Sequence, residues 1–362
     1  MQHRAPQGAV TPYIPLNGAT ARALAAWIGL GGPLGRALVG TEAGDAPMPG
    51  ARPCPLPGSW ADGRRWWWVE DAAAVWRWVD EHGRSCHRRW PRPWTVGEEA
   101  LALGAHTHTM GIVNATPDSF SDGGRWVEPA DGVKAARALW SAGLDWVDLG
   151  GESTRPGHTP VDDGTEWERL GPVLRGLQPE ERRVLSVDTR HPAVGARALE
   201  GGAAVLNDVS CLADPEWLPL LAQTRCGYVL MYNRPGPAGR LSWLDVLQRI
   251  GDTLDRLLAA GVALERVIVD PGIGFAYGGA DNVTVLHNLG LLRVFDRPVL
   301  AGPSRKRFLG HLTGRPVDDR DRASAIAAFA AVQAGADMVR MHDAAGALDA
   351  ARMADALEYG GE

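Results

Sequence analysis

Eight short apolar runs, rich in β-branched residues, recur along the chain from residue 109 onward. Between them, apolar residues return at the i, i+3, i+4 spacing that places side chains on one face of a helix, as in 133–140, 244–258 and 323–334. The pattern predicts strands that alternate with crossover helices. The predicted strands are 109–115, 146–150, 184–188, 204–209, 228–232, 267–271, 298–302 and 338–342.

Eight strand–helix units over roughly 250 residues are typical of an α/β protein folded as a (β/α)8 TIM barrel. We expect this barrel to occupy residues 105–360. A doubly wound open sheet is the alternative architecture. It is disfavoured because no GxGxxG segment follows the first predicted strand.

Residues 1–100 have a different composition, with nine of the 15 tryptophans and a Pro/Gly-rich segment at 53–58. The periodicity predicts a helix over 71–82. We expect a Trp-rich N-terminal extension or small subdomain to which the sequence assigns no role. A packed unit or docking surface is favoured over a base-stacking platform because no lysine accompanies the rings.

The overall composition excludes several classes of protein. A hydrophobic fraction of 45% and a charged fraction of 22% exclude a wholly disordered chain. A net charge of −6 argues against a protein that coats nucleic acid. The apolar segment 23–38 is too short to span a bilayer, and the four cysteines form no CxxC pair. We therefore expect a cytoplasmic protein with neither nucleic acid nor a membrane as its partner.

Polar residues follow or end every predicted strand, where a barrel core would not select them. In a TIM barrel these carboxyl ends converge on one mouth, where active sites lie. Helix caps explain any one of these residues, but not the set. The mixture suits a polar heterocycle held beside an anionic leaving group. The residues are Asn114, Asp148, Asp188, Asn207, Asp208, Asn233, Arg234, Asp270, Ser304, Arg305, Lys306, Arg340 and His342.

Seven sequence blocks stand out along the chain. They are MGIVNATPDSFSDGG (110–124), DLGGESTRPG (148–157), SVDT (186–189), LNDVS (206–210), VDPGIGF (269–275), GPSRK (302–306) and VRMHD (339–343). In this order and at this spacing, the blocks resemble the dihydropteroate synthase family. The resemblance covers about residues 108–358 and leaves 1–100 outside it. A single Gly-rich block is weak evidence, whereas seven blocks in register are specific.

The resemblance implies a transferase of folate biosynthesis. Such an enzyme condenses 6-hydroxymethyl-7,8-dihydropterin pyrophosphate with p-aminobenzoate to give 7,8-dihydropteroate and pyrophosphate, and sulfonamides compete with p-aminobenzoate. A dihydropterin presents N–H donors that carboxylates and an amide oxygen accept. By resemblance, the pterin-binding residues are Asp148, Asp188, Asn207, Met231, Asp270 and Lys306.

The resemblance also implies which residues bind p-aminobenzoate, the diphosphate and the metal ion, and which are catalytic. The p-aminobenzoate groove is formed by Thr154, Pro156, Phe275 and Ser304. The diphosphate is bound by Asn114, Arg155, Arg340 and His342, with Mg²⁺ held through Asn114. The catalytic set is Lys306, Arg340, His342, Arg155 and Asp118, of which Asp118 lies with Ser119 and Phe120 in a loop expected to fold over the site.

Two positions depart from the family pattern. Met231 is followed by Tyr232 and Asn233 where the family has a His-Met pair, and Ala276-Tyr277 stands where it has Gly-Lys. These changes leave two alternatives open. One is a specialised or non-catalytic pterin-binding paralogue. The other is a methyltetrahydrofolate-dependent methyltransferase with a corrinoid partner, which has no use for the diphosphate residues. The family resemblance also implies a homodimer.

His106 and His108 form an HxH pair, a pattern that near a first barrel strand indicates a metal-dependent hydrolase. Such hydrolases carry the pair at the carboxyl end of the strand. Here it precedes the predicted strand 109–115. We therefore expect the pair at the opposite end of the barrel from the mouth and interpret it as structural.

Overall fold

In the residues that it describes, the computed structural model has three separate sheets. In the N-terminal region, β1 (Ala37–Glu42), β3 (Arg64–Val69) and β2 (Arg52–Pro53) form an antiparallel sheet in that order. The helix predicted over 71–82 lies outside the described residues. The structure describes residues 37–42, 52–53, 64–69, 92–104, 106–116, 128–152, 160–234, 240–241, 243–295 and 297–359.

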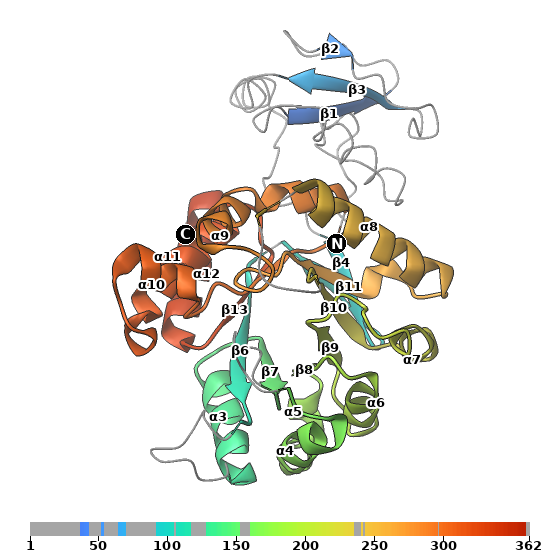
Figure 1. Cartoon of the computed structure of the whole chain (residues 1–362), viewed down its shortest axis with the longest axis vertical. Coiled ribbons are helices and arrows are strands. Elements are labelled where there is room, and N and C mark those ends of the chain that lie inside the picture. Colours follow the sequence, from blue (N-terminus) through green and yellow to red (C-terminus); the bar gives the residue numbers. More distant parts are fainter. Residues whose placement is uncertain are drawn as a thin grey trace.

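The main sheet has eight parallel strands in the spatial order β11-β10-β9-β8-β7-β6-β13-β12 (Figure 1). A parallel bridge between Val269 and Val299 joins the two ends and closes the barrel. The predicted (β/α)8 fold is therefore confirmed, with strand bounds close to those expected. The strands are β6 (His108–Asn114), β7 (Trp146–Gly150), β8 (Leu185–Asp188), β9 (Val205–Asp208), β10 (Gly227–Met231), β11 (Val267–Asp270), β12 (Leu300–Ala301) and β13 (Met338–Met341).

Helices follow the strands and cover the outside of the barrel. The three helices predicted from apolar periodicity match α3, α8 and α11. Among the residues that the structure describes, no helix combines the length and apolar character that a bilayer span requires. The α-helices are α3 (Pro129–Ser141), α4 (Asp163–Gly176), α5 (Pro179–Arg182), α6 (Pro192–Glu200), α7 (Trp217–Gln223), α8 (Trp243–Ala259), α9 (Gly279–His287), α10 (Arg307–Thr313), α11 (Asp321–Gln333) and α12 (Ala344–Tyr359), with 3-10 turns at η2 (Leu264–Arg266), η3 (Leu289–Phe295) and η4 (Val317–Asp319).

A hairpin of β4 (Arg92–Val96) and β5 (Glu99–Leu103) packs on the amino-terminal end of the barrel. Its Trp94 is fully buried among side chains of the barrel strands, including Met110 and Trp146. The indole Nε1 of Trp94 donates to the Arg266 carbonyl at 2.9 Å. The hairpin therefore closes the end opposite the mouth, and the expected boundary near residue 100 falls within it.

Candidate active site

Strand alternation decides which polar side chains reach the inside of the barrel. Val147 and Leu149 belong to the apolar layer beneath the helices, so Asp148 between them points inward. The same alternation turns Asp188 and Asn207 inward and leaves Asp208 on the helix side. There Asp208 accepts hydrogen bonds from the Ser210 hydroxyl and two backbone amides, and from a buried tyrosine, Tyr228. Asp208 is thus a packing residue, unlike its neighbours at the mouth.

Arg340 joins two of the inward carboxylates. Its Nε donates to Asp148 Oδ2 at 2.6 Å, and its Nη2 donates to Asp188 Oδ2 at 2.7 Å. The amide of Asn207 donates to the same Asp148 oxygen at 2.9 Å. The planar guanidinium can bridge two carboxylates in this way because its donors are fixed in a fork. Strands β7, β8, β9 and β13 thereby contribute to one network.

Burial favours the neutral forms of three ionisable side chains at the mouth. Desolvation, reinforced by Asp148 and Glu166, raises the pKa of Asp188 to about 7 against the opposing effect of Arg340. Desolvation also raises the pKa of Asp270 to about 6, although the Gly272 amide donates to this carboxylate at 2.7 Å. Desolvation and then Arg340 lower the pKa of Lys306 to about 8. Perturbed pKa values of this kind cluster at functional sites.

Lys306 crosses the mouth above an aromatic ring. Its Nζ lies 3.9 Å from the centroid of Phe275, a cation–π contact. Gly274 has φ +83°, and a Cβ there would lie 2.5 Å from Lys306 Cδ, so only glycine leaves room for this side chain. A pocket at the mouth is lined by Asn207, Met231, Asp270, Phe275, Lys306 and Arg340, among others.

Ser304 and His342 lie next to each other at the same end of the barrel. The Ser304 hydroxyl and His342 Nδ1 are 2.8 Å apart, and the His342 amide donates to that hydroxyl at 3.0 Å. Between Ser304 and Lys306, Arg305 has φ 55°, a left-handed conformation that costs a non-glycine residue about 1–2 kcal/mol. This conformation sets the directions of the two flanking side chains.

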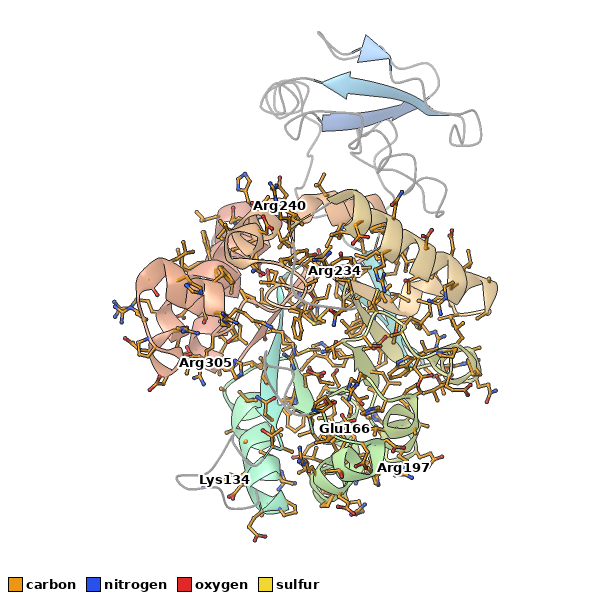
Figure 2. All side chains as sticks on the ribbon, viewed as in Figure 1. Lys134, Glu166, Arg197, Arg234, Arg240 and Arg305 are labelled. Carbon is orange, nitrogen blue, oxygen red and sulfur yellow. The ribbon has the colours of Figure 1, made fainter. Side chains whose placement is uncertain are left out.

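Asp321 at the start of α11 holds this strained turn, and the sequence carried no signal for it. Its carboxylate accepts two bonds from the Arg305 guanidinium, at 2.6 and 2.8 Å. The Arg305 amide donates to the Ser324 hydroxyl at 2.9 Å. Arg305, labelled in Figure 2, thus pairs with the start of α11 and is not among the residues that line the pocket at the mouth.

A second group that sequence reasoning missed stands behind Asp188. Glu166 of α4 is fully buried (Figure 2) and accepts from the Thr189 hydroxyl at 2.9 Å. His191 Nδ1 lies 2.7 Å from the same oxygen. Burial raises the pKa of Glu166, and the carboxyl in turn raises that of Asp188.

The remaining residues that the family resemblance implies divide into two groups. Asn114 ends β6, and its Oδ1 lies 3.6 Å from where a Cβ on Gly150 would stand, at the edge of the mouth near Asp188. The others lie outside the described residues: Asp118, Ser119, Phe120, Thr154, Arg155 and Pro156.

The two departures from the family pattern meet in space. The rings of Tyr232 and Tyr277 are stacked with centroids 5.6 Å apart and planes inclined by 12°. The Tyr277 hydroxyl donates to the Pro271 carbonyl at 2.6 Å, and the Tyr232 hydroxyl donates to Asp245 of α8. The pair thus braces the backbone that follows Asp270. Two changes that looked independent in the sequence are one packing feature.

Comparison with known proteins gives a consistent result. The pterin binding enzyme family matches residues 110–342. The chain is 36% identical to the dihydropteroate synthase of Synechocystis sp. over 74% of this chain and 96% of that protein. It is 38% identical to that of Mycobacterium leprae over 71% and 95%.

Solved structures agree. The dihydropteroate synthase of Xanthomonas albilineans, determined with 4-aminobenzoic acid, has a TM-score of 0.70 at 38% identity and covers 75% of this chain and 99% of its own. The Burkholderia cenocepacia enzyme, complexed with 7,8-dihydropteroate, has a TM-score of 0.65 at 34% identity and covers 74% and 96%. This chain is therefore a member of the dihydropteroate synthase family of pterin-binding enzymes.

Proposed function

We propose that this chain is a working dihydropteroate synthase. It joins 6-hydroxymethyl-7,8-dihydropterin pyrophosphate to p-aminobenzoate and releases pyrophosphate. The observation that carries the proposal is the mouth itself, where Arg340 bridges Asp148 and Asp188 and Lys306 lies over Phe275. A methyltransferase that uses methyltetrahydrofolate has no diphosphate to hold and no need of this positive charge. The family match and the mouth residues that the structure describes favour the synthase over a binding paralogue.

Unsatisfied acceptors support the assignment of the pterin side. Asp148 Oδ1 is buried and has no hydrogen-bond partner among the described residues, which is costly until a donor arrives. A dihydropterin supplies such donors through its 2-amino group and ring N–H. Asp188, Asp270 and the Asn207 amide take further donors, while Lys306 donates to ring acceptors. Met231 lines the pocket beside them.

The chemistry breaks one bond and forms another at the pterin methylene. The C–O bond to the diphosphate breaks, and the amine nitrogen of p-aminobenzoate bonds to the same carbon and then loses a proton to solvent. Arg340 and His342, with Arg155, bind the departing anion, whose charge grows in the transition state. Phe275 and Ser304, with Thr154 and Pro156, orient the amine. Asp118 belongs to the loop that we propose covers the site.

Asn114 fits a Mg²⁺ ion. Its Oδ1 is a neutral hard oxygen at the edge of the mouth, near Asp188, and Mg²⁺ binds proteins through few oxygen ligands while it keeps waters and substrate phosphate oxygens. When bound there, the ion would neutralise the charge that develops on the leaving diphosphate.

A product assay, with EDTA and a sulfonamide as inhibitors, tests the proposed function. Purified protein with both substrates and Mg²⁺ is expected to form dihydropteroate, detected by mass spectrometry. Chelation by EDTA should stop the reaction and added Mg²⁺ should restore it, while a sulfonamide should compete with p-aminobenzoate. If the protein binds the pterin substrate but forms no dihydropteroate, the result would instead support a non-catalytic pterin-binding paralogue.

We also propose that the enzyme is a cytoplasmic homodimer. Large apolar side chains are exposed on adjacent helices, namely Ile326 on α11 and Met353 and Leu357 on α12. An exposed apolar surface of this kind is typical of an interface between subunits. Sedimentation equilibrium is expected to give twice the chain mass of 38.7 kDa.

The ionisation of the mouth predicts a pH profile. Since Asp188 has a pKa of about 7 and Lys306 of about 8, kcat/KM for the pterin substrate should be highest at about pH 7 to 8. It should fall on the acid side as Asp188 and then Asp270 take up protons, and on the basic side as Lys306 loses its own. Steady-state rates from pH 5 to 9.5 measure this. A flat profile would contradict the assignment.

On the acid side of the profile, the contribution of Asp188 to the free energy of unfolding changes with pH in the opposite direction to kcat/KM. A carboxyl whose pKa is raised by folding contributes stability that is present below its unfolded pKa and is lost as the pH rises through its folded pKa. Asp188→Asn removes this loss. Relative to the wild type, the ligand-free variant is therefore expected to be more stable at pH 8 than at pH 5, as measured by urea unfolding.

Tyr277→Phe tests the brace beside Asp270. It removes the bond to the Pro271 carbonyl, which should lower the free energy of unfolding by about 1 kcal/mol and raise KM for the pterin substrate. Tyr228→Phe is the matched control, because Tyr228 donates its buried hydroxyl to Asp208 on the helix side of the sheet. The control should lose stability and keep the wild-type KM. Equal KM values in both variants would show that the stacked tyrosines do not contribute to substrate binding.

A further inference from the structure

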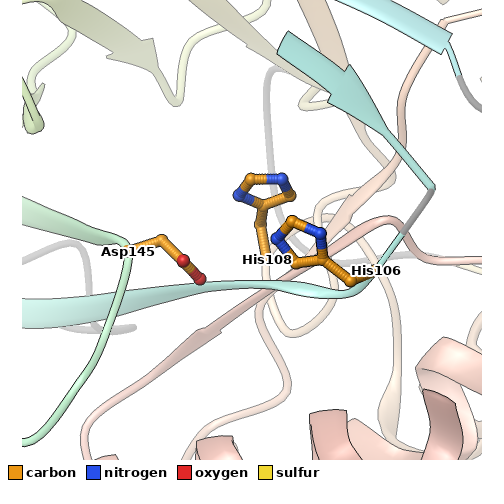
Figure 3. Close-up of side chains that lie close together, drawn as sticks. All are labelled: His106, His108 and Asp145. Carbon is orange, nitrogen blue, oxygen red and sulfur yellow. The ribbon is translucent and has the colours of Figure 1, made fainter. Parts of the chain in front are cut away.

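The end of the barrel opposite the mouth carries its own cluster of ligand-type side chains. His106 precedes β6, His108 begins it, and Asp145 immediately precedes β7. One donor atom from each residue lies within 4.8 Å of the others. Figure 3 shows the two imidazole rings and the carboxylate facing a common space. This position confirms that the HxH pair lies away from the active site.

We propose that His106, His108 and Asp145 bind a divalent transition-metal ion of the Zn²⁺ type. Two imidazoles and one carboxylate are the donor set that zinc and other first-row ions take in three-ligand sites, with water completing the shell. Mg²⁺ prefers oxygen donors and a strict octahedron, so this site differs in chemistry from the one proposed at Asn114. His106 is exposed, which gives the ion and its water ligands a path from solvent.

A buried nitrogen at the site has no partner among the residues that the structure describes. His108 is 7% exposed, and its Nδ1 makes no hydrogen bond to any of them. A buried polar atom without a partner is costly, and coordination through this nitrogen would satisfy it.

The ligands are held in place from both sides. Thr107, between the two histidines, donates from its amide and its hydroxyl to Asp355 of α12 at 2.8 and 2.7 Å. Thr109 donates in the same way to Asp145 Oδ2, at 2.7 and 2.8 Å. These bonds fix the strand and the carboxylate and leave Asp145 Oδ1 to take up an ion. Such supporting bonds orient metal ligands in known sites.

The surrounding charge attracts a cation. Three carboxylates act on the His108 ring, those of Asp145, Asp337 and Asp355. Asp337 pairs with Arg92 at 4.0 Å, and Asp355 is held by Thr107. Asp145 is thus the carboxylate best placed to coordinate. An ion there would tie the segment that enters the barrel from the β4–β5 hairpin to the loop before β7.

Zinc titration of the full chain, without an affinity tag and with excess Mg²⁺ present, tests the site. Isothermal titration calorimetry should show one Zn²⁺ bound per wild-type chain. His106→Ala alters an exposed side chain and should weaken binding by more than about 10-fold, since loss of even a supporting group costs that much. Asp145→Asn, which keeps the bonds from Thr109, should also weaken it. His311→Ala, an exposed histidine of α10, is the matched control and should bind as the wild type does.

Two further readouts separate this site from the active site. Zn²⁺ should raise the unfolding temperature of the wild type and of His311→Ala, but not of His106→Ala. Dihydropteroate synthesis should be the same in the wild type and His106→Ala. Failure of the wild type to bind Zn²⁺, or equal Zn²⁺ affinity in the wild type and His106→Ala, would overturn the proposal.

Discussion

Asp188→Asn is expected to weaken binding of the dihydropterin substrate by about 10- to 100-fold and to leave the barrel folded. The substitution removes a charged acceptor at the mouth, and hydrogen bonds to charged groups contribute about 1.5–3 kcal/mol. The amide keeps nearly the same shape, so packing against β7 and β9 is preserved. Calorimetric titration with the pterin pyrophosphate measures the loss directly.

Asp208→Asn is the matched control for that experiment. Asp208 is also a buried carboxylate at a strand end, one residue after Asn207, but it lies on the helix side of the sheet. Its substitution should lower thermal stability and leave pterin affinity at the wild-type level. Wild-type affinity in Asp188→Asn, or an equal loss in both variants, would show that the inward carboxylates do not recognise the substrate.

Arg340→Ala is expected to damage both stability and catalysis. It leaves the buried Asp148 and Asp188 carboxylates without their shared cation, and removing one partner of a buried ion pair costs about 3–5 kcal/mol. The loss should be smaller at pH 5 than at pH 8, because the Asp188 carboxyl, with a pKa of about 7, is protonated at pH 5 and then needs no cation. Removing one donor that stabilises transition-state charge lowers kcat by about 10²- to 10³-fold. Urea unfolding and steady-state kinetics measure the two effects.

Two further variants serve as controls. One keeps the positive charge at position 340, and the other removes an arginine far from the mouth. Arg340→Lys keeps the charge but not the fork, so it should recover part of the stability and little of the rate. Arg137→Ala breaks an exposed pair with Glu181 on α5 and should cost less than about 1 kcal/mol, with an unchanged rate. Full activity in Arg340→Ala would remove this residue from the reaction.

Much of the barrel was predictable because each strand is short, apolar and closed by a polar residue. The prediction for 298–302 was the loosest, since only Leu300–Ala301 pairs as β12. The β4–β5 hairpin was missed because its register depends on Trp94 reaching the barrel core, a contact that local periodicity does not contain. The inward direction of Asp148 followed from the period of two along a strand.

The network inside the mouth could not be predicted to the same depth. The sequence placed Arg340 at the mouth, but its two partners depend on how β13, β7 and β8 are arranged around the closed sheet. The stacking of Tyr232 on Tyr277 likewise joins two strand ends through the barrel geometry. Asp321 and Glu166 act from helices, where an acidic residue near the first turn is ordinary.

Simultaneous measurement of both products tests the central claim most directly. Purified protein, Mg²⁺, the dihydropterin pyrophosphate and ¹⁵N-labelled p-aminobenzoate are mixed, and labelled dihydropteroate and free pyrophosphate are quantified over time. We predict that the two products appear at equal rates and that Arg340→Ala depresses both together. Pyrophosphate release without labelled dihydropteroate, or neither product from a protein that binds the pterin substrate, would contradict the assignment of this mouth as a dihydropteroate synthase active site.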